Sequence, residues 1–418
     1  MPPYRKIKRN YSKPFFGKRR RGLAGAPILL ILSLALAAIG SFLLFGWVFR
    51  IEVETAVNEF MGTPRPTATL PSSQYAQRGF SLYLEGKLEE ALADFERARA
   101  QRPNDVNYLY EHGQILIELD EYEMAAAIGD QAIEAAPEDP RGYALKARAL
   151  MWSDPGSAIP VAVSGLEQDA DFAPLHAALA VAYTNIGRYA EGLQRGIRAT
   201  ELDPLNAFAH RAYSIPLIYT GRSNDAIAAL EKAVAINPNL TAPYFELAAQ
   251  HRATGYQEMA VGIYRRILEL EPDNAKAYLR ICQTYAEVGE FLEGTRFCDT
   301  ATEIDETYAP AWQMLGQLQY NRRNYESAVD SLEKCVEHGS TAVECYYIRG
   351  LAYYFLGDCQ RAWDTLLESF RYTTAPSIID IINRGLRDIR ADCPGFENAR
   401  LPTPIPPTPI PPTPIGGI

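Results

Sequence analysis

Small and apolar residues recur along the middle of the chain with a period close to 34 residues. Glycines mark this period at Gly187, Gly221, Gly255 and Gly289. When each unit is numbered so that this glycine is position 15, apolar positions 4, 8 and 11 fall on one helical stripe and positions 20, 24 and 27 on a second. The pattern predicts two amphipathic helices in every unit, and self-similarity at this period indicates a repeat architecture.

Two positions hold small residues in every unit, which allows the two helices to approach closely. Position 8 is occupied by Gly79, Gly113, Ala147, Ala180, Ser214, Ala248, Cys282, Gly316 and Gly350. Position 20 is occupied by Ala91, Ala125, Ala158, Gly192, Ala226, Ala260, Gly294, Ala328 and Ala362. The two stripes of one unit are therefore expected to face each other.

Glycine and proline delimit the two helices of a unit. Glycine at position 15 ends the first helix because it adopts a positive φ at little steric cost. Proline cannot continue the second helix, and it stands at position 32 in five units, as Pro103, Pro137, Pro204, Pro238 and Pro272. Each unit is predicted to be a helical hairpin, and because one hairpin cannot bury both its faces, neighbours should stack into a solenoid.

With glycine at position 8, alanine at positions 20 and 27 and proline at position 32, the chain resembles the tetratricopeptide repeat family. The resemblance covers residues 72–376, nine units. It implies an all-α, right-handed superhelical solenoid of about nine helical hairpins. Position 4, often tryptophan in that family, is here Tyr75, Leu109, Tyr143, His176, His210, Tyr244, Tyr278, Trp312 and Tyr346.

Some units depart from the pattern. The turn of the third unit is one residue short and Ala170 replaces its proline, while Glu306, Ser340 and Thr374 stand at position 32 of the last three units. Residues 377–394 carry apolar residues at helical spacing but are too few for another pair. This segment is predicted to be a cap helix that covers the last apolar face.

The N-terminal part of the chain predicts a membrane anchor. Residues 1–22 hold nine Lys or Arg and no acidic residue, and residues 22–49 carry no charge. An apolar run of this length is enough for a transmembrane helix, placed here at 23–49. Basic residues flanking a span stay on the cytoplasmic side, so residues 1–22 form a cytoplasmic head and the repeats are expected outside the cytoplasm. The alternative is a cleaved signal peptide, since "ALA" at 35–37 resembles a cleavage site.

Pro and Thr dominate the two remaining segments. Residues 50–71, which include most of the stretch "MGTPRPTATLPSS" at 61–73, are expected to be a linker. Residues 395–418, which end in "LPTPIPPTPIPPTPIGGI", are expected to be an extended polyproline II tail. The tail is interpreted as a spacer, with a glycan acceptor or a ligand for another domain as alternatives.

Charge argues against nucleic acid as a partner. The whole chain has a net charge of −10. Removing the nine basic residues of 1–22 leaves 32 basic against 51 acidic residues, a net of −19. A solenoid this acidic is poorly suited to binding phosphate backbones.

Six cysteines lie between residues 282 and 393. Positions of a hairpin whose numbers sum to about thirty face each other, which pairs Cys282 with Cys298. Cys335 closes one unit and Cys345 opens the next, and Cys359 should meet Cys393 at the end of an antiparallel cap. Three such candidate disulfides would fit an oxidising exterior, and the alternative is six reduced, buried thiols.

No cofactor, metal or catalytic residue is predicted. His176 and His210 occupy position 4 of successive units, but that position is normally an aromatic core site and no cysteine or carboxylate recurs beside it at zinc-ligand spacing. The chain contains no HExxH, GxSxG or phosphate-loop motif. We therefore expect a protein that is not an enzyme.

Recognition is the remaining function. The family resemblance implies that first-helix side chains off the core stripe line a concave face that holds peptides. The candidate groove residues are Phe80, Tyr83, Tyr110, Gln114, Arg148, Trp152, Arg211, Tyr219, Phe245, Arg252, Arg280, Gln283, Gln317, Tyr320, Tyr347 and Tyr354. Aromatic residues and arginine are favoured as binding anchors, although the aromatic residues could instead pack between units. The two hypotheses are a membrane-anchored scaffold for protein or peptide partners, and a protein that binds cell-envelope polysaccharide or assists its export.

Overall fold

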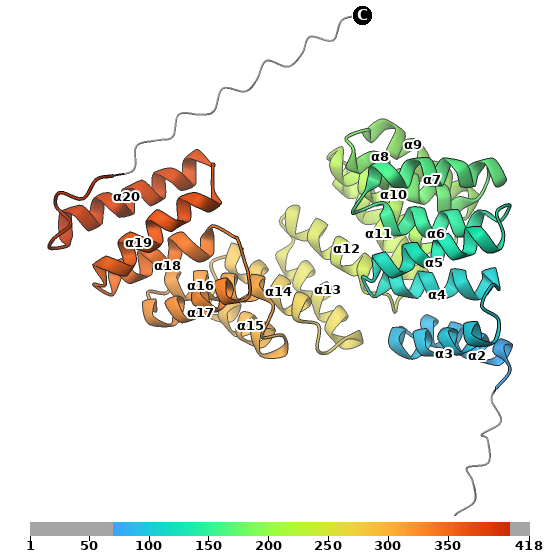
Figure 1. The fold of residues 1–418 in the computed structure, drawn as a ribbon, viewed down its shortest axis with the longest axis horizontal. Helices are drawn as coiled ribbons and strands as arrows, with labels where there is room; N and C mark the ends of the chain where they lie inside the picture. Colours follow the sequence, from blue (N-terminus) through green and yellow to red (C-terminus); the bar gives the residue numbers. More distant parts are fainter. Residues whose placement is uncertain (1–69, 402–418) are drawn as a thin grey trace, which may run out of the picture. The chain divides into compact units, whose positions relative to one another are not determined.

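A computed structural model describes residues 70–401, and every regular element in this range is a helix (Figure 1). Nine helix pairs follow one another. They are α2 Ser72–Leu84 with α3 Leu88–Gln101, α4 Val106–Glu118 with α5 Tyr122–Ala135, α6 Pro140–Leu150 with α7 Pro155–Gln168, α8 Ala173–Asn185 with α9 Tyr189–Leu202, α10 Ala207–Tyr219 with α11 Ser223–Ile236, α12 Ala242–Ala253 with α13 Gln257–Leu270, α14 Ala275–Glu287 with α15 Phe291–Ile304, α16 Ala309–Asn321 with α17 Tyr325–Glu337, and α18 Glu344–Phe355 with α19 Cys359–Ser369. A 3₁₀ turn, Phe370–Tyr372, and α20, Pro376–Asp392, come last. The prediction of an all-α solenoid of helical hairpins is confirmed.

The turn inside each hairpin depends on one residue with a positive φ. This residue stands at position 15 in eight of the nine units, and it is glycine in six of them. Asp120 (φ 63°) and Arg323 (φ 62°) take its place in the second and eighth units. The third unit, with its shortened turn, has no such residue, and α6 ends at Leu150 before α7 begins at Pro155.

Small residues at position 8 make room for bulky side chains at position 24 of the partner helix. A Cβ atom on Gly316 would lie 2.5 Å from Leu332 Cγ, and one on Gly350 would lie 2.8 Å from Leu366 Cγ. Contacts this short are not tolerated in packed cores. Position 8 therefore sets how closely the two helices of a hairpin approach.

Side chains at position 4 connect most units to the one before. In six units, a ring N–H or O–H group at this position reaches the main-chain oxygen six residues earlier, at position 32. The pairs are Tyr143 with Pro137 (3.1 Å), His176 with Ala170 (2.9 Å), His210 with Pro204 (2.9 Å), Tyr244 with Pro238 (3.1 Å), Trp312 with Glu306 (2.8 Å) and Tyr346 with Ser340 (3.1 Å). The carbonyl accepts this bond with or without proline, so the boundary survives where proline is missing.

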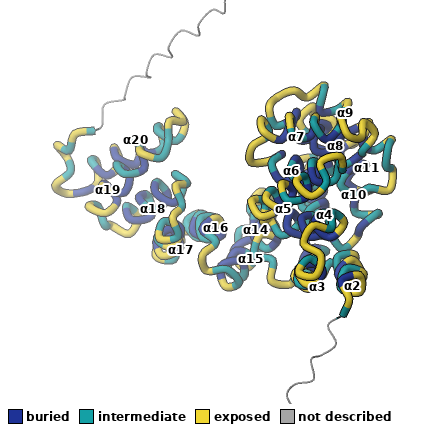
Figure 2. Tube along the Cα trace, turned by 45° about the vertical axis from the view of Figure 1, so that its right-hand side comes forward, coloured by how far each residue is buried: buried dark blue, intermediate teal, exposed yellow. Residues whose placement is uncertain are grey.

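First helices of successive units pack on one another along most of the repeat array. The helices α4, α6, α8 and α10 do so in order, as do α14, α16 and α18. The helix α8 is buried along nearly its whole length (Figure 2). By contrast, α12 packs mainly on α11 and α13 and makes hardly any backbone contact with α10 or α14. The first-helix face therefore opens at α12.

The first hairpin also contacts a loop 155 residues further along the chain. Asn239, between α11 and α12, donates its side-chain N–H to the main-chain oxygen of Leu84 at 2.8 Å. A Cβ atom on Gly86, which has a φ of 79°, would lie 2.7 Å from Asn239 O. Leu240 is buried in the same apolar cluster as Leu88 and Phe95. The array thus comes back on itself between units 1 and 5.

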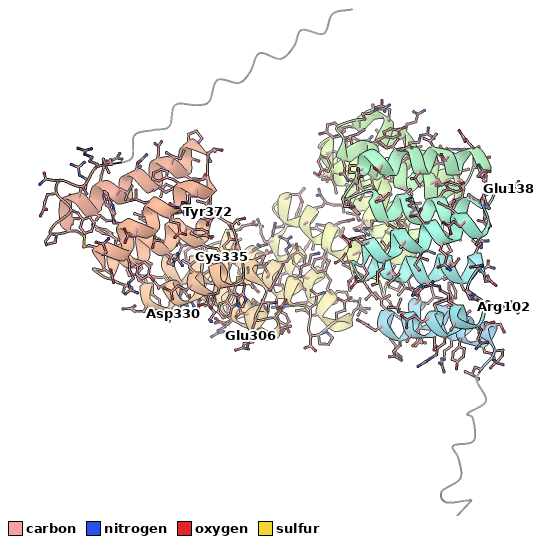
Figure 3. All side chains as sticks on the ribbon, viewed as in Figure 1. Arg102, Glu138, Glu306, Asp330, Cys335 and Tyr372 are labelled. Atoms are coloured by element: carbon pink, nitrogen blue, oxygen red, sulfur yellow. A yellow bond between two sulfur atoms is a disulfide. The ribbon has the colours of Figure 1, made fainter. Side chains whose placement is uncertain are left out.

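Three disulfides lie in the C-terminal units. They join Cys282 to Cys298 (Cα–Cα 5.4 Å), Cys335 at the end of α17 to Cys345 at the start of α18 (6.2 Å; Figure 3 labels Cys335), and Cys359 to Cys393 (6.0 Å). These are the three pairs inferred from the sequence. Cys282 and Cys298 occupy positions 8 and 24, so this disulfide stands where other units pack a small residue against a bulky one.

Several predicted segments lie outside the described residues: the basic head at 1–22, the membrane span at 23–49, nearly all of the linker at 50–71, and the tail from 402 onward. Among residues 70–401, none of the helices combines the length and the apolar character needed to cross a membrane.

Candidate functional site

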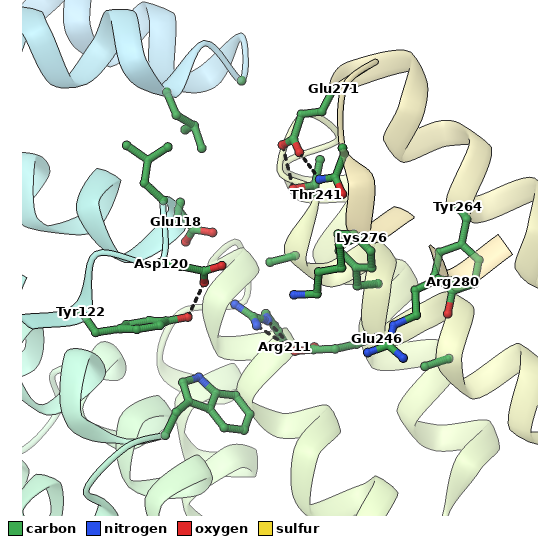
Figure 4. A pocket seen from close by; sticks show the side chains of 18 of the residues that line it. Glu118, Asp120, Tyr122, Arg211, Thr241, Glu246, Tyr264, Glu271, Lys276 and Arg280 are labelled. Carbon is green, nitrogen blue, oxygen red and sulfur yellow. Dashed lines mark hydrogen bonds and ion pairs between the residues drawn. The ribbon is translucent and has the colours of Figure 1, made fainter. Parts of the chain in front are cut away.

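The opening at α12 forms a hollow of about 710 Å³ (Figure 4). Its walls come from the α4–α5 turn and the start of α3 on one side, α10 and α12 in the middle, and α13 and α14 on the other. The hollow exists because the array returns on itself, which brings residues of units 1 and 2 opposite residues of units 6 and 7.

A second hollow of about 320 Å³ lies beside the Leu84–Asn239 contact. It is lined by α2, α4 and the start of α10, and by the loop from Ile236 to Leu240. Glu118 and Arg211 line both hollows. The two hollows are therefore adjacent and share these side chains.

Nine of the sequence-predicted groove residues line the two hollows. Trp152, Phe245, Arg252 and Arg280 line the larger one, Phe80, Tyr83, Gln114 and Arg148 the smaller one, and Arg211 both. They come from units 1, 2, 3, 5, 6 and 7, so the structure brings together residues up to 200 positions apart.

The other seven candidates, Tyr110, Tyr219, Gln283, Gln317, Tyr320, Tyr347 and Tyr354, line neither hollow. Three of the tyrosines among them contact side chains of a neighbouring helix. Tyr320 lies against Tyr325 with ring centroids 5.6 Å apart, Tyr219 stacks on Tyr189 at 5.8 Å, and Tyr354 donates its hydroxyl to Asp392 at 2.5 Å. Gln283 accepts an N–H from Arg280 at 2.9 Å, next to the larger hollow.

The α3–α5 side of the larger hollow is acidic. Glu89, Glu118 and Asp120 line it. Glu118 forms a buried ion pair with Arg148, and Asp120 accepts the hydroxyl of Tyr122 at 2.6 Å. Burial, and then this hydrogen bond to Asp120, raise the pKa of Tyr122 to about 12.

A pair of opposite charges stands in the middle of the hollow. Arg211 on α10 and Glu246 on α12 form an ion pair at 2.8 Å, and both side chains are less than one fifth exposed. Burial disfavours the charged form of Arg211, but the attraction of Glu246 and Glu118 outweighs it and raises its pKa. This pair links two first helices that otherwise barely touch.

The α12–α14 side carries three basic residues, Arg252, Lys276 and Arg280, and a further acid, Glu271, which accepts hydrogen bonds from Thr241 and Asn274. Arg252 forms a long ion pair with Glu287, in which Arg252 Nε lies 3.5 Å from Glu287 Oε1. Lys276 lies over the Phe245 ring, 5.0 Å from its centroid, and Arg280 bonds to Gln283. Neither Lys276 nor Arg280 forms an ion pair within residues 70–401. The hollow therefore has an acidic side and a basic side that face each other (Figure 4).

Sequence reasoning missed several residues of the larger hollow. Glu118 and Lys276 occupy first-helix positions of the kind expected to line the groove, but they are not aromatic, arginine or glutamine residues, the types that predict groove contacts here. Tyr264 lies on a second helix, where the repeat pattern predicts a core residue. Tyr264 lines the hollow because α12 barely packs on α10 and α14, and the repeat period does not reveal this difference.

Histidines and acids do not gather into a metal site in the described part of the chain. His176 and His210 each bind a different main-chain oxygen, as described above. The side chains that line the two hollows offer charge pairing, hydrogen bonding and apolar contact, which are typical of recognition.

Tetratricopeptide repeat models match three parts of the chain. One model matches residues 82–149, and a second matches residues 217–240 and 309–337. The first segment runs from the end of α2 to α6, in units 1 to 3. The other two contain the end of α10 with α11, in unit 5, and α16 with α17, in unit 8.

Characterised relatives are distant. Hsp70-Hsp90 organizing protein 1 of Glycine max is 21% identical over 263 residues, which are 63% of this chain and 41% of that protein. TPR repeat-containing protein YpiA of Bacillus subtilis (strain 168) is 20% identical over 297 residues, 62% of this chain and 70% of that protein. The chain thus spans about two fifths of the organizing protein's length.

A solved structure of similar fold is the APC/C hetero-tetramer Cut9-Hcn1. It superposes with a TM-score of 0.56 at 16% sequence identity, over 71% of this chain and 59% of that one. At this identity the likeness concerns the fold alone. The models identify tetratricopeptide repeats in the matched segments, and the solved structure shares the helical fold of this chain.

Proposed function

We propose that this protein is an interaction scaffold that holds a protein partner, as an extended peptide segment, in the two adjoining hollows of its first seven units. The observation that carries the proposal is the larger hollow, which combines apolar anchors (Trp152 and Phe245) with opposed acidic and basic sides. Apolar pockets with a few placed polar groups are typical binding sites. The organizing proteins that share its repeats are named for two chaperones, which favours a protein partner here as well.

We also propose that the scaffold is anchored in a membrane with its repeats outside the cytoplasm. The uncharged run at 22–49 and the basic residues before it support the anchor and its orientation. Three disulfides support an oxidising compartment, because disulfides persist there and are rare in the cytosol.

The geometry favours a peptide over a polysaccharide. Sugars are bound on flat, exposed aromatic faces, whereas the larger hollow is flanked by Arg211, Arg252 and Arg280. Arginine side chains offer several N–H donors for the carboxylates and main-chain oxygens of a peptide. Polysaccharide binding is the alternative, and capture of the ligand distinguishes the two.

The test is capture of the partner by the full chain from membranes of the cells that produce it. We expect a protein to co-purify with the wild type and to be lost with the double variant Phe80→Ala and Trp152→Ala, whose side chains are exposed in the hollows. A matched control is Tyr256→Ala, which is more exposed and lies outside both hollows. Recovery of polysaccharide without protein would replace this function with the alternative.

A further inference from the structure

The basic side of the larger hollow contains buried polar atoms that have no hydrogen-bond partner within the described chain. Tyr264 is 0% exposed, yet its hydroxyl makes no hydrogen bond. Arg252 Nη1 and Glu246 Oε2 are likewise buried and unpaired. All three residues line the same hollow. Buried polar groups are nearly always satisfied in native proteins, so these three atoms leave hydrogen-bonding capacity that a ligand in the hollow can use.

The basic side chains around these atoms favour a ligand with an acidic group. Arg252 and Arg280 are close enough to the Tyr264 hydroxyl to oppose the rise in its pKa that burial causes. Lys276 and Arg280 have no ion-pair partner in the described chain, and Figure 4 shows Arg280 next to Tyr264. A carboxylate can accept hydrogen bonds from two guanidinium groups and a phenol at once, and such charge-assisted bonds are the strong ones.

Glu246 excludes a bare inorganic anion as the full occupant. Its Oε1 pairs with Arg211, while its Oε2 has no hydrogen-bond donor among residues 70–401. A peptide supplies both kinds of group, because main-chain N–H donors lie next to any acidic side chain. The ligand must therefore carry a carboxylate and an N–H group close together.

We propose that the larger hollow recognises the side-chain carboxylate of an Asp or Glu residue within an extended peptide. The carboxylate accepts from Tyr264, Arg252 and Arg280, with Lys276 nearby, and a neighbouring main-chain N–H donates to Glu246 Oε2. This specificity rests on the proposed function, since it names the chemistry of the partner that the scaffold holds.

The rest of the protein makes this recognition selective. Beyond residue 22 the chain has a net charge of −19, so a polyanion is repelled and the basic side is a local exception. On the facing acidic side Glu118 already pairs with Arg148, while Glu89 and Asp120 suit a basic residue elsewhere in the same peptide. The preferred ligand is a peptide of mixed charge with an acidic residue at one fixed place.

The experiment selects ligands for the full chain, held in mild detergent, from a phage library of random ten-residue peptides. The displayed peptides have no free C-terminus, so only side-chain carboxylates are offered. We expect one position of the selected peptides to be enriched in Asp or Glu. The tightest peptide is then resynthesised with both ends capped, with Gln or Asn replacing that acid, and with phosphoserine in its place.

Tyr264→Phe is the decisive variant because it removes one hydroxyl and changes no charge. Any attraction of acidic peptides to the basic residues of 1–22 is therefore the same in the wild type and the variant. We expect its affinity for the acidic peptide to fall about ten-fold, the loss of one hydrogen bond to a charged group. Affinity for the Gln or Asn peptide should already be low and should not change. The melting temperature of the free protein should stay the same or rise, because phenylalanine removes an unpaired buried hydroxyl. Tyr219→Phe, exposed and outside the hollow, is the matched control.

Each other outcome has a definite meaning. Selection of peptides without an acidic position would overturn this inference and keep the proposed function, whereas selection of no peptide at all would overturn both. Equal affinity of wild type and Tyr264→Phe for the acidic peptide would also overturn the inference. A lower melting temperature of the free variant would overturn it too, because it would show that the hydroxyl has a structural partner within the protein. Tighter binding of the phosphoserine peptide would replace carboxylate with phosphate as the preferred group.

Discussion

Single residues at position 4 do more than fill the core of each unit. Tyrosine, histidine and tryptophan share a flat ring with a polar N–H or O–H at its far end, and in six units that end reaches the carbonyl at position 32. This shared property explains why histidine substitutes for an aromatic residue at His176 and His210. It also gives both histidines a structural role that needs no metal.

This role predicts different effects for two substitutions of His210, which is buried in α10. His210→Phe removes the donor and leaves Pro204 O without its bond, so we expect a loss of about 1 kcal/mol in the free energy of unfolding. His210→Tyr should retain the bond, since Tyr143 and Tyr244 make the same contact in other units. Chemical denaturation, with amide exchange of α10 and α11 as a local probe, measures both. Equal stability of the two variants would show that the hydrogen bond contributes nothing.

The helices themselves were predictable because their determinants are local. The small residue at position 8, the residue at position 15 and the apolar stripe all act within one hairpin, so a 34-residue period reveals them. Asp120 and Arg323 show the limit of this approach. Both adopt the left-handed conformation that sequence reasoning assigns to glycine, because the turn between two packed helices requires it.

The last helix depends on a covalent tie as well as on its apolar stripe. Ile382, Leu386 and Ile389 of α20 are fully buried against the final hairpin. The disulfide between Cys359 and Cys393 fastens the far end of α20 to the start of α19. End units of a solenoid have a neighbour on one side only, so they are the first to fray.

Removing this disulfide should therefore loosen one end of the molecule. The double variant Cys359→Ser and Cys393→Ser opens a loop of 34 residues, for which the chain-entropy model gives a loss of about 3 to 4 kcal/mol. We expect faster amide exchange in α18, α19 and α20 and unchanged exchange in α4 to α8. The matched control is Cys282→Ala with Cys298→Ala, whose effect should centre on α14 and α15. Slow exchange in α20 without the bond would mean that apolar packing alone holds the cap.

At the scale of the whole molecule, the two hollows could not be predicted from the period. Glu118 and Lys276 meet across one hollow although 158 residues separate them, because the array returns on itself and Leu84 contacts Asn239. That return depends on small rotations between successive hairpins, which accumulate over five units. Repeat positions predict Arg211, Phe245 and Arg252 as groove residues, but these rotations determine which of them line one hollow.

The proposed orientation in the membrane makes the final prediction. Residues 1–22 carry nine basic residues and no acid, and basic flanks are retained in the cytoplasm. With one tag at each end of the chain, a broad-specificity protease added to intact cells should remove the C-terminal tag and spare the N-terminal one. Permeabilised cells, in which both tags should be lost, are the control. Survival of both tags in intact cells would place the repeats inside. Absence of the N-terminal tag before any protease is added would identify a cleaved signal peptide, because the mature chain would then begin after the apolar run.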